Sequence, residues 1–127
     1  MTEARRALGK KGEEAARVFL ERRGVRILAA NYACAAGEID LIGREGEAIL
    51  FIEVKARTSR RFGPPQLAVH RRKQRQIVRT AQWFLTERRT PEVACRFDVL
   101  AVDFVGDEPP RIQWVRDAFP AEGVGVW

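Results

Sequence analysis

The chain has 127 residues, 46% of them hydrophobic and 31% charged, which is the size and balance of one globular domain with its own core. No apolar run is long enough to span a bilayer, and this excludes a helical membrane protein. The net charge of +6 and the isoelectric point of about 10.1 indicate a polyanionic partner.

The N-terminus and the two cysteines bear on the cellular compartment. Residues 1–6 are followed by further charge rather than by an apolar segment, so no secretory signal is expected. Cys34 and Cys95 belong to no CxxC or Cys/His pattern. We therefore expect a cytoplasmic protein in which both thiols are reduced.

Hydrophobic periodicity predicts an alternation of helices and strands. Apolar residues recur at helical spacing over residues 4–23, where Gly24 gives a stop, and again over residues 70–88. A hairpin turn is predicted at 43–47 and a loop at 58–65. In chain order the predicted elements are a helix at 4–23, strands at 25–31, 37–42 and 49–55, a helix at 70–88, and strands at 93–105 and 112–115.

The order α-β-β-β-α-β-β predicts an α/β fold with a central mixed sheet flanked by helices. The first three strands are expected to form an antiparallel meander. The second helix would then be a crossover that places strand 93–105 parallel to strand 49–55. We expect one domain over residues 1–119, followed by a loosely ordered tail at 120–127.

Two neighbouring strands carry charge where apolar residues would pack a sheet. Because side chains alternate along a strand, Glu38 and Asp40 share one face of strand 37–42, opposite Ile39 and Leu41. A carboxylate among apolar residues is costly unless a cation or hydrogen bonds compensate it.

Strand 49–55 repeats the pattern, since Glu53 and Lys55 share a face with Ile49 and Phe51. Two carboxylates and a lysine that converge in this way predict a divalent cation site. Carboxylate oxygens suit Mg²⁺, or Mn²⁺, and Mg²⁺ takes one or two protein carboxylates and keeps several waters.

Phosphodiester hydrolysis would give these groups defined roles. Asp40 and Glu53 would bind the metal, together with the backbone carbonyl of Val54. Lys55 would orient the attacking water or stabilise the pentacovalent phosphate. Glu38 would be a further ligand, or would support the ligands by hydrogen bonds.

Several blocks of the sequence resemble known families. Asp40 followed by Glu53-Val54-Lys55 is similar to the D…(D/E)xK signature of the restriction-endonuclease-like nucleases. The chain also carries, in order, Gly12-Glu13, GEIDLI at 37–42, FIEVKAR at 51–57, Phe62-Gly63 and Arg96-Phe97-Asp98. From about residue 7 to about residue 119 these blocks resemble the YraN-like family of uncharacterised bacterial proteins.

The nuclease resemblance implies a restriction-endonuclease-like fold and metal-dependent catalysis. It matches Glu13, on the first helix, to the additional acidic residue of the nuclease site, where it would hold a metal-bound water or a second ion. A helix-borne Glu followed by D…ExK is also similar to the archaeal Holliday-junction resolvases. That similarity and the small size imply a homodimer or a partner protein.

A basic segment without acids follows the charged strands. Nine Lys or Arg residues and no Asp or Glu lie between Val54 and Thr86. Such a segment is typical of a solvated face or of a phosphate-binding surface. We favour phosphate binding because the arginines directly follow the predicted site. The residues expected to contact nucleic acid are Arg57, Arg60, Arg61, Arg71, Arg72, Lys73, Arg75 and Arg79.

Alternative interpretations remain open for several of these residues. Glu53 and Lys55 could form an ion pair on a solvated sheet face. Glu13 could be an exposed helix carboxylate. Lys73 and Gln76 lie on the helix where related nucleases often carry a polar residue that faces the site.

Three further polar or aromatic positions have structural interpretations. Asp98 beside Arg96 is expected to make a structural contact, and His70 is expected in a loop or at a helix start. Trp83 could stack on a base or belong to the core.

The sequence therefore predicts a metal-dependent endonuclease that hydrolyses phosphodiester bonds in DNA, with RNA as the less favoured substrate and no membrane partner. The alternative is a non-catalytic nucleic-acid-binding module that keeps the nuclease fold. The presence of Asp40, Glu53 and Lys55 together favours the enzyme, because a degenerate site would more often have lost one of them.

Overall fold

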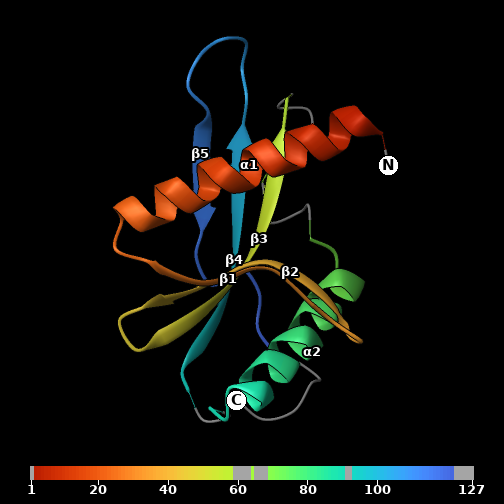
Figure 1. The fold of residues 1–127 in the computed structure, drawn as a ribbon, viewed down its shortest axis with the longest axis vertical. Coiled ribbons are helices and arrows are strands. Elements are labelled where there is room, and N and C mark those ends of the chain that lie inside the picture. Colours follow the sequence, from red (N-terminus) through yellow and green to blue (C-terminus); the bar gives the residue numbers. More distant parts are fainter. Residues whose placement is uncertain (1, 59–63, 65–68, 91–92, 122–127) are drawn as a thin grey trace.

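The computed structural model describes residues 2–58, 64, 69–90 and 93–121, and within them the elements follow the predicted order (Figure 1). The predicted loop at 58–65 lies mostly outside these residues, as does the tail from residue 122. No described helix is both long and apolar enough to cross a membrane. The elements are α1 (Glu3–Arg22), β1 (Arg26–Cys34), β2 (Gly37–Glu45), β3 (Ala48–Arg57), α2 (Arg71–Glu87), β4 (Cys95–Asp103) and β5 (Arg111–Val115).

The strands form one mixed sheet in the order β1-β2-β3-β4-β5. β1, β2 and β3 pair antiparallel, β4 pairs parallel to β3 after the α2 crossover, and β5 pairs antiparallel to β4. The predicted meander and crossover are thus confirmed. The hairpin turn is shorter than predicted, because Gly43 belongs to β2: a Cβ there would lie 2.6 Å from Val25 Cγ1, so the glycine serves close packing rather than a turn.

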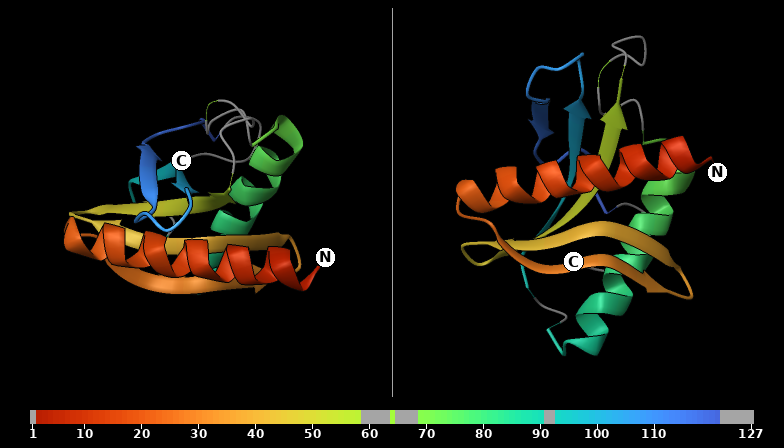
Figure 2. Two further views of the ribbon diagram at one scale, coloured as in Figure 1. Left: turned by 90° about the horizontal axis from the view of Figure 1, so that it is seen from above. Right: turned by 45° about the horizontal axis from the view of Figure 1, so that its top comes forward.

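The two helices cover opposite faces of the sheet. Leu50 and Ile52 of β3 pack in the cluster that contains α1 residues, and Phe51 packs in the cluster that contains α2 residues, so the predicted alternation of β3 is confirmed. Ile39 and Leu41, which are predicted to share a face, occupy alternate positions in the regular part of the β1–β2 pairing but contact different helices. Ile39 packs with α2 and Leu41 with α1, because the β1–β2 hairpin curves strongly out of the plane of the other strands (Figure 2).

A close contact fixes the position of α1 on the sheet. Gly12 is buried in α1, and a Cβ at this residue would lie 2.5 Å from the Cβ of Ala56 in β3. Only glycine therefore allows this approach of helix to strand. The next residue, Glu13, is consequently held beside the diverging ends of β2 and β3.

Candidate active site

The candidate site lies where β2 and β3 separate. The last residues paired between them are Leu41 and Ile52, and one further step in the same register would set Asp40 opposite Glu53. Instead, the backbone N–H of Val54 donates a hydrogen bond of 2.8 Å to Asp40 Oδ2. This bond fixes the Asp40 carboxylate beside Glu53. Figure 2 shows β2 and β3 diverging from one another.

Glu53 is a buried acid among charges of both signs. Its side chain is 6% exposed. Burial, a hydrogen bond with Asp40 and the negative charge of Asp40 raise the pKa of Glu53 to about 8, against the opposing effect of Lys73 and Lys55. Two carboxylates that meet in this way hold a proton near neutral pH, which is the behaviour of a paired acidic site rather than of two surface carboxylates.

Two lysines reach the same carboxylate from different elements. Lys55 Nζ, from β3, lies 3.8 Å from Glu53 Oε2, and Lys73 Nζ, from the first turns of α2, lies 3.7 Å from the same atom. The alternative interpretation was an ion pair on a solvated face. The ion pair of Glu53 and Lys55 is confirmed, but the solvated face is not, because Glu53 is almost inaccessible to solvent. Lys73 is the polar residue of the second helix that faces the site.

The other helix position considered, Gln76, packs against the β1–β2 hairpin. A Cβ on Gly37 would lie 2.8 Å from Gln76 Cγ. Gln76 therefore helps to hold the start of β2 against α2.

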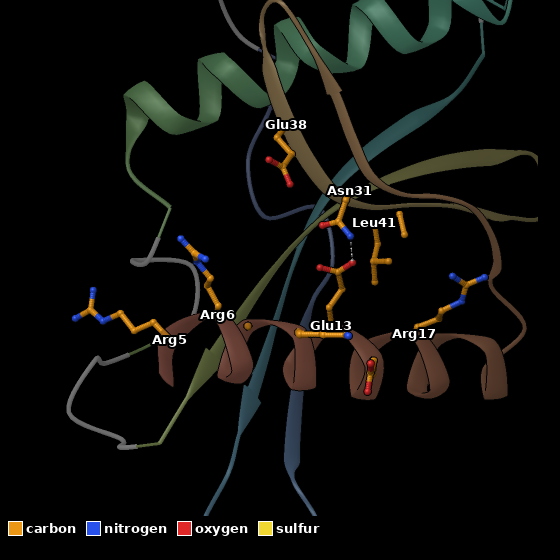
Figure 3. A pocket seen from close by; sticks show the side chains of 11 residues that line it. Arg5, Arg6, Glu13, Arg17, Asn31, Glu38 and Leu41 are labelled. Carbon is orange, nitrogen blue, oxygen red and sulfur yellow. Dashed lines mark hydrogen bonds between the residues drawn. The ribbon is translucent and has the colours of Figure 1, made fainter. Parts of the chain in front are cut away.

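Glu13 approaches Asp40 from the α1 side of the sheet. Its Oε1 accepts a hydrogen bond of 2.7 Å from Asn31 Nδ2 (Figure 3). Burial first, and then the charge of Asp40, raise the pKa of Glu13, while the bond from Asn31 lowers it and the charge of Glu38 raises it further. Glu13 is thus half-buried and electrostatically linked to Asp40, and Glu38 is an exposed neighbour of this group.

The donor set at the centre of the site fits a hard divalent cation. No three His, Cys, Asp or Glu side chains within the described residues are grouped as a metal site. Mg²⁺, however, commonly takes one or two protein carboxylates and keeps its remaining waters. Asp40 and Glu53 would hold such an ion, and its charge would favour the ionised form of Glu53 that burial and Asp40 disfavour.

The basic residues predicted to contact nucleic acid divide into four groups. Arg60 and Arg61 lie outside the described residues. Arg57 departs from the prediction of an exposed phosphate contact: it is 7% exposed, and its Nε and Nη2 donate to Asp103 at 2.7 and 3.1 Å, a pairing that sequence spacing does not reveal. Lys73 turns toward Glu53. The exposed members on α2 are Arg71, Arg72, Arg75 and Arg79.

The structure also brings out residues that the sequence interpretation missed. A groove lies between α1 and the β1–β2 hairpin, with Glu13 and Asn31 among its lining residues. The signal available in the sequence was the helical recurrence of basic residues along α1, which the basic segment at 55–79 overshadowed. The basic residues that line this groove are Arg5, Arg6, Lys10 and Arg17.

The remaining polar positions are structural, as predicted. Asp98 is 1% exposed and accepts hydrogen bonds from Arg96 and from Trp114 Nε1 at 2.8 Å. His70 is the N-cap of α2, where its side chain accepts from the N–H of Lys73. Trp83 is 49% exposed, which excludes it from the core.

Comparison with known proteins places the site within a shared family. Residues 12–102, which include the Asp40–Glu53 site, match the family model described as "Uncharacterised protein family UPF0102". The chain belongs to the UPF0102 family. A UPF0102 protein of Geobacter metallireducens is 46% identical over 114 residues, which cover 90% of this chain and 93% of the relative. A UPF0102 protein of Syntrophotalea carbinolica is 43% identical over 123 residues, which cover 97% and 99%.

UPF0102 is the YraN-like family, so this membership confirms the resemblance to that family inferred from the sequence blocks. The names of these UPF0102 relatives state no activity.

Proposed function

We propose that the chain is a metal-dependent endonuclease that hydrolyses phosphodiester bonds in DNA. The observation that carries the proposal is the pairing of the half-buried Asp40 with the buried Glu53, with the ammonium groups of Lys55 and Lys73 within 4 Å of Glu53. A restriction-endonuclease-like fold is part of the proposal. Its support is the mixed sheet with an α2 crossover and with D…ExK on the two diverging strands.

The side chains of the site have complementary roles in this reaction. A bound Mg²⁺ or Mn²⁺ supplies charge neutralisation and an activated water. Asp40, oriented by the N–H of Val54, and Glu53 would hold such an ion. Lys55, one-third exposed, is placed to orient the water or to stabilise the negative charge that develops on phosphate.

Lys73 and Glu13 complete the site from the two helices. Lys73 lies 3.7 Å from the buried Glu53 and favours its ionised form, against the effects of burial and of Asp40. Glu13, held by Asn31 and close to Asp40, would position a water bound to the ion.

A nucleic-acid backbone fits the charge that surrounds the site, and we propose DNA as the substrate. The exposed arginines of α2 begin beside Lys73, so phosphates on either side of the scissile bond would meet guanidinium groups. Such contacts predict binding with a strong dependence on salt and little dependence on base sequence. The exposed α2 arginines are Arg71, Arg72, Arg75 and Arg79.

The test is cleavage of a panel of duplex, single-stranded, flap and four-way DNA substrates, with RNA equivalents, in Mg²⁺ or Mn²⁺. Wild type should cut at least one substrate, and Asp40→Asn should lose at least about 100-fold in rate, as is typical when an electrostatic catalytic group is removed. The matched control is Asp107→Asn, in the exposed turn before β5, which should cut at the wild-type rate.

The outcomes separate the enzyme from its alternative. If no substrate is cut although DNA is bound, the chain is a non-catalytic nucleic-acid-binding module. If Asp40→Asn cuts as fast as wild type, the assigned site is wrong.

A further inference from the structure

A groove on the α1 side of the site carries its own set of charges. Its volume is about 590 Å³, and its walls are α1 and the β1–β2 hairpin. Figure 3 shows Glu13 in the middle of the helix wall, with Arg5 and Arg6 toward one end and Arg17 toward the other. Basic side chains therefore flank the acid that lies close to Asp40.

These basic side chains have few protein partners. Within the described residues, Arg5, Arg6 and Lys10 form no ion pair with an acidic side chain. Arg17 pairs with Glu21 at 3.8 Å, where both side chains are about half exposed. An exposed pair of this kind contributes little free energy, so it competes weakly with a phosphate.

The dimensions of the groove select the form of nucleic acid. The groove is bounded on one side by α1 and on the other by the β1–β2 hairpin, and its volume of about 590 Å³ is on the scale of a pocket for a small ligand. We therefore expect a single strand to enter it more readily than a duplex, whose major groove alone is about 12 Å wide. From Arg6 to Arg17 the helix rises by about 16 Å, which spans about five steps of a strand at about 3.4 Å each.

We propose that this groove holds a single-stranded segment of the DNA substrate through phosphate contacts with Arg5, Arg6, Lys10 and Arg17. The proposal rests on the proposed function and extends it to a substrate class: DNA with a single-stranded arm beside the scissile bond. Glu13 and Leu41, the residue after Asp40, both line the groove, so a strand bound there would lie beside the Asp40–Glu53 pair.

The lining also indicates how the strand is recognised. Among the described residues, none that lines the groove is aromatic, so these residues offer no stacking platform for bases. Recognition is then through the backbone, independent of sequence and sensitive to salt.

The experiment is fluorescence anisotropy with a short labelled oligonucleotide, single-stranded or annealed to its complement, in EDTA at several salt concentrations. The variant R5Q/R6Q/K10Q should bind the single strand at least about ten-fold more weakly than wild type, with the salt slope reduced by about 2, since each single-strand phosphate contact contributes about 0.7. The duplex affinity of this variant should change no more than that of the control variant R22Q/R26Q/R44Q.

The control R22Q/R26Q/R44Q removes the same charge from exposed residues away from the groove. It should retain single-strand binding within about two-fold. Equal losses in the two variants, no loss in either, or a larger loss for duplex than for single strand would overturn the groove assignment.

A gain of affinity provides a second test that misfolding cannot mimic. Glu14 is exposed and lines the groove, so Glu14→Gln should strengthen single-strand binding a few-fold by removing a charge that repels phosphate. Glu47→Gln, in the β2–β3 turn, should bind as wild type does. No gain for Glu14→Gln counts against the groove.

Because these measurements are made without metal, they are independent of catalysis. If wild type cleaves DNA but the groove variants do not change single-strand binding as predicted, the groove proposal alone is overturned. Groove binding as predicted, with no cleavage of any substrate, overturns the nuclease proposal alone.

Discussion

Replacing Glu53 by glutamine should change how the stability of the protein depends on pH. The pKa of Glu53 is about 8 in the folded chain, against an ordinary 4.5, so the folded state keeps a proton that the unfolded state releases. The stability contributed by protonated Glu53 is therefore complete below pH 4.5 and is lost as pH rises through about 8. Glutamine does not titrate, so the stability of Glu53→Gln should not fall in this way as pH rises.

The magnitude follows from the two pKa values. A difference of about 3.5 pKa units, at about 1.4 kcal/mol per unit, gives an upper limit of about 5 kcal/mol. Most of it falls between pH 5 and pH 9. Over this interval the free energy of unfolding of Glu53→Gln, minus that of wild type, should rise by up to about 4 kcal/mol.

Urea denaturation followed by circular dichroism, in EDTA at pH 5, 7 and 9, measures this difference. Glu47→Gln, which removes an exposed carboxylate from the β2–β3 turn, is the control and should stay parallel to wild type. A constant difference between Glu53→Gln and wild type across the three pH values would refute the assignment of Glu53 as an acid protonated by burial and by Asp40.

Three other measurements address the metal, the helix contact and the buried arginine. Mg²⁺ at 100 times its dissociation constant should stabilise the wild-type fold by about 2.7 kcal/mol, which thermal unfolding would show as a higher melting temperature. An equal rise in Asp40→Asn would refute binding at this site. Gly12→Ala should cost about 1–3 kcal/mol in denaturant unfolding, because its Cβ would lie 2.5 Å from that of Ala56; the added Ala56→Gly should restore stability, and failure to do so would place the strain elsewhere. Arg57→Leu should lower the free energy of unfolding by about 3–5 kcal/mol, because it leaves the Asp103 carboxylate without its ion-pair partner. The salt dependence of DNA binding should stay unchanged, and a slope lower by about 1 would show that Arg57 contacts phosphate after all.

Much of the architecture could be predicted because its signals are local. The alternation along 49–55 identified β3 with its correct faces, and helical periodicity identified α1 and α2 to within a few residues. The short connections between the first strands required an antiparallel meander, and the helix between β3 and β4 allowed a parallel pair. Gly43 misled the turn prediction because glycine serves both turns and close packing.

The parts of the site that sequence did not reveal depend on contacts between distant segments. The D…ExK spacing identified Asp40 and Glu53, but not the hydrogen bond from Val54 that holds them together. The burial of Arg57 depends on Asp103, 46 positions later. Likewise, the sequence left open whether Lys73 or Gln76 faces the site, and the contact of Lys73 with Glu53 identifies Lys73.

We propose that Asp40 and Glu53 form a metal-dependent phosphodiesterase site, and single-turnover cleavage measured as a function of Mg²⁺ concentration tests this proposal. With the best substrate of the panel, the rate should be zero in EDTA and should rise to a plateau with Mg²⁺. Asp40→Asn should stay at least about 100-fold below wild type at every concentration. Cleavage that persists in EDTA, or a variant that reaches the wild-type plateau, would contradict the account.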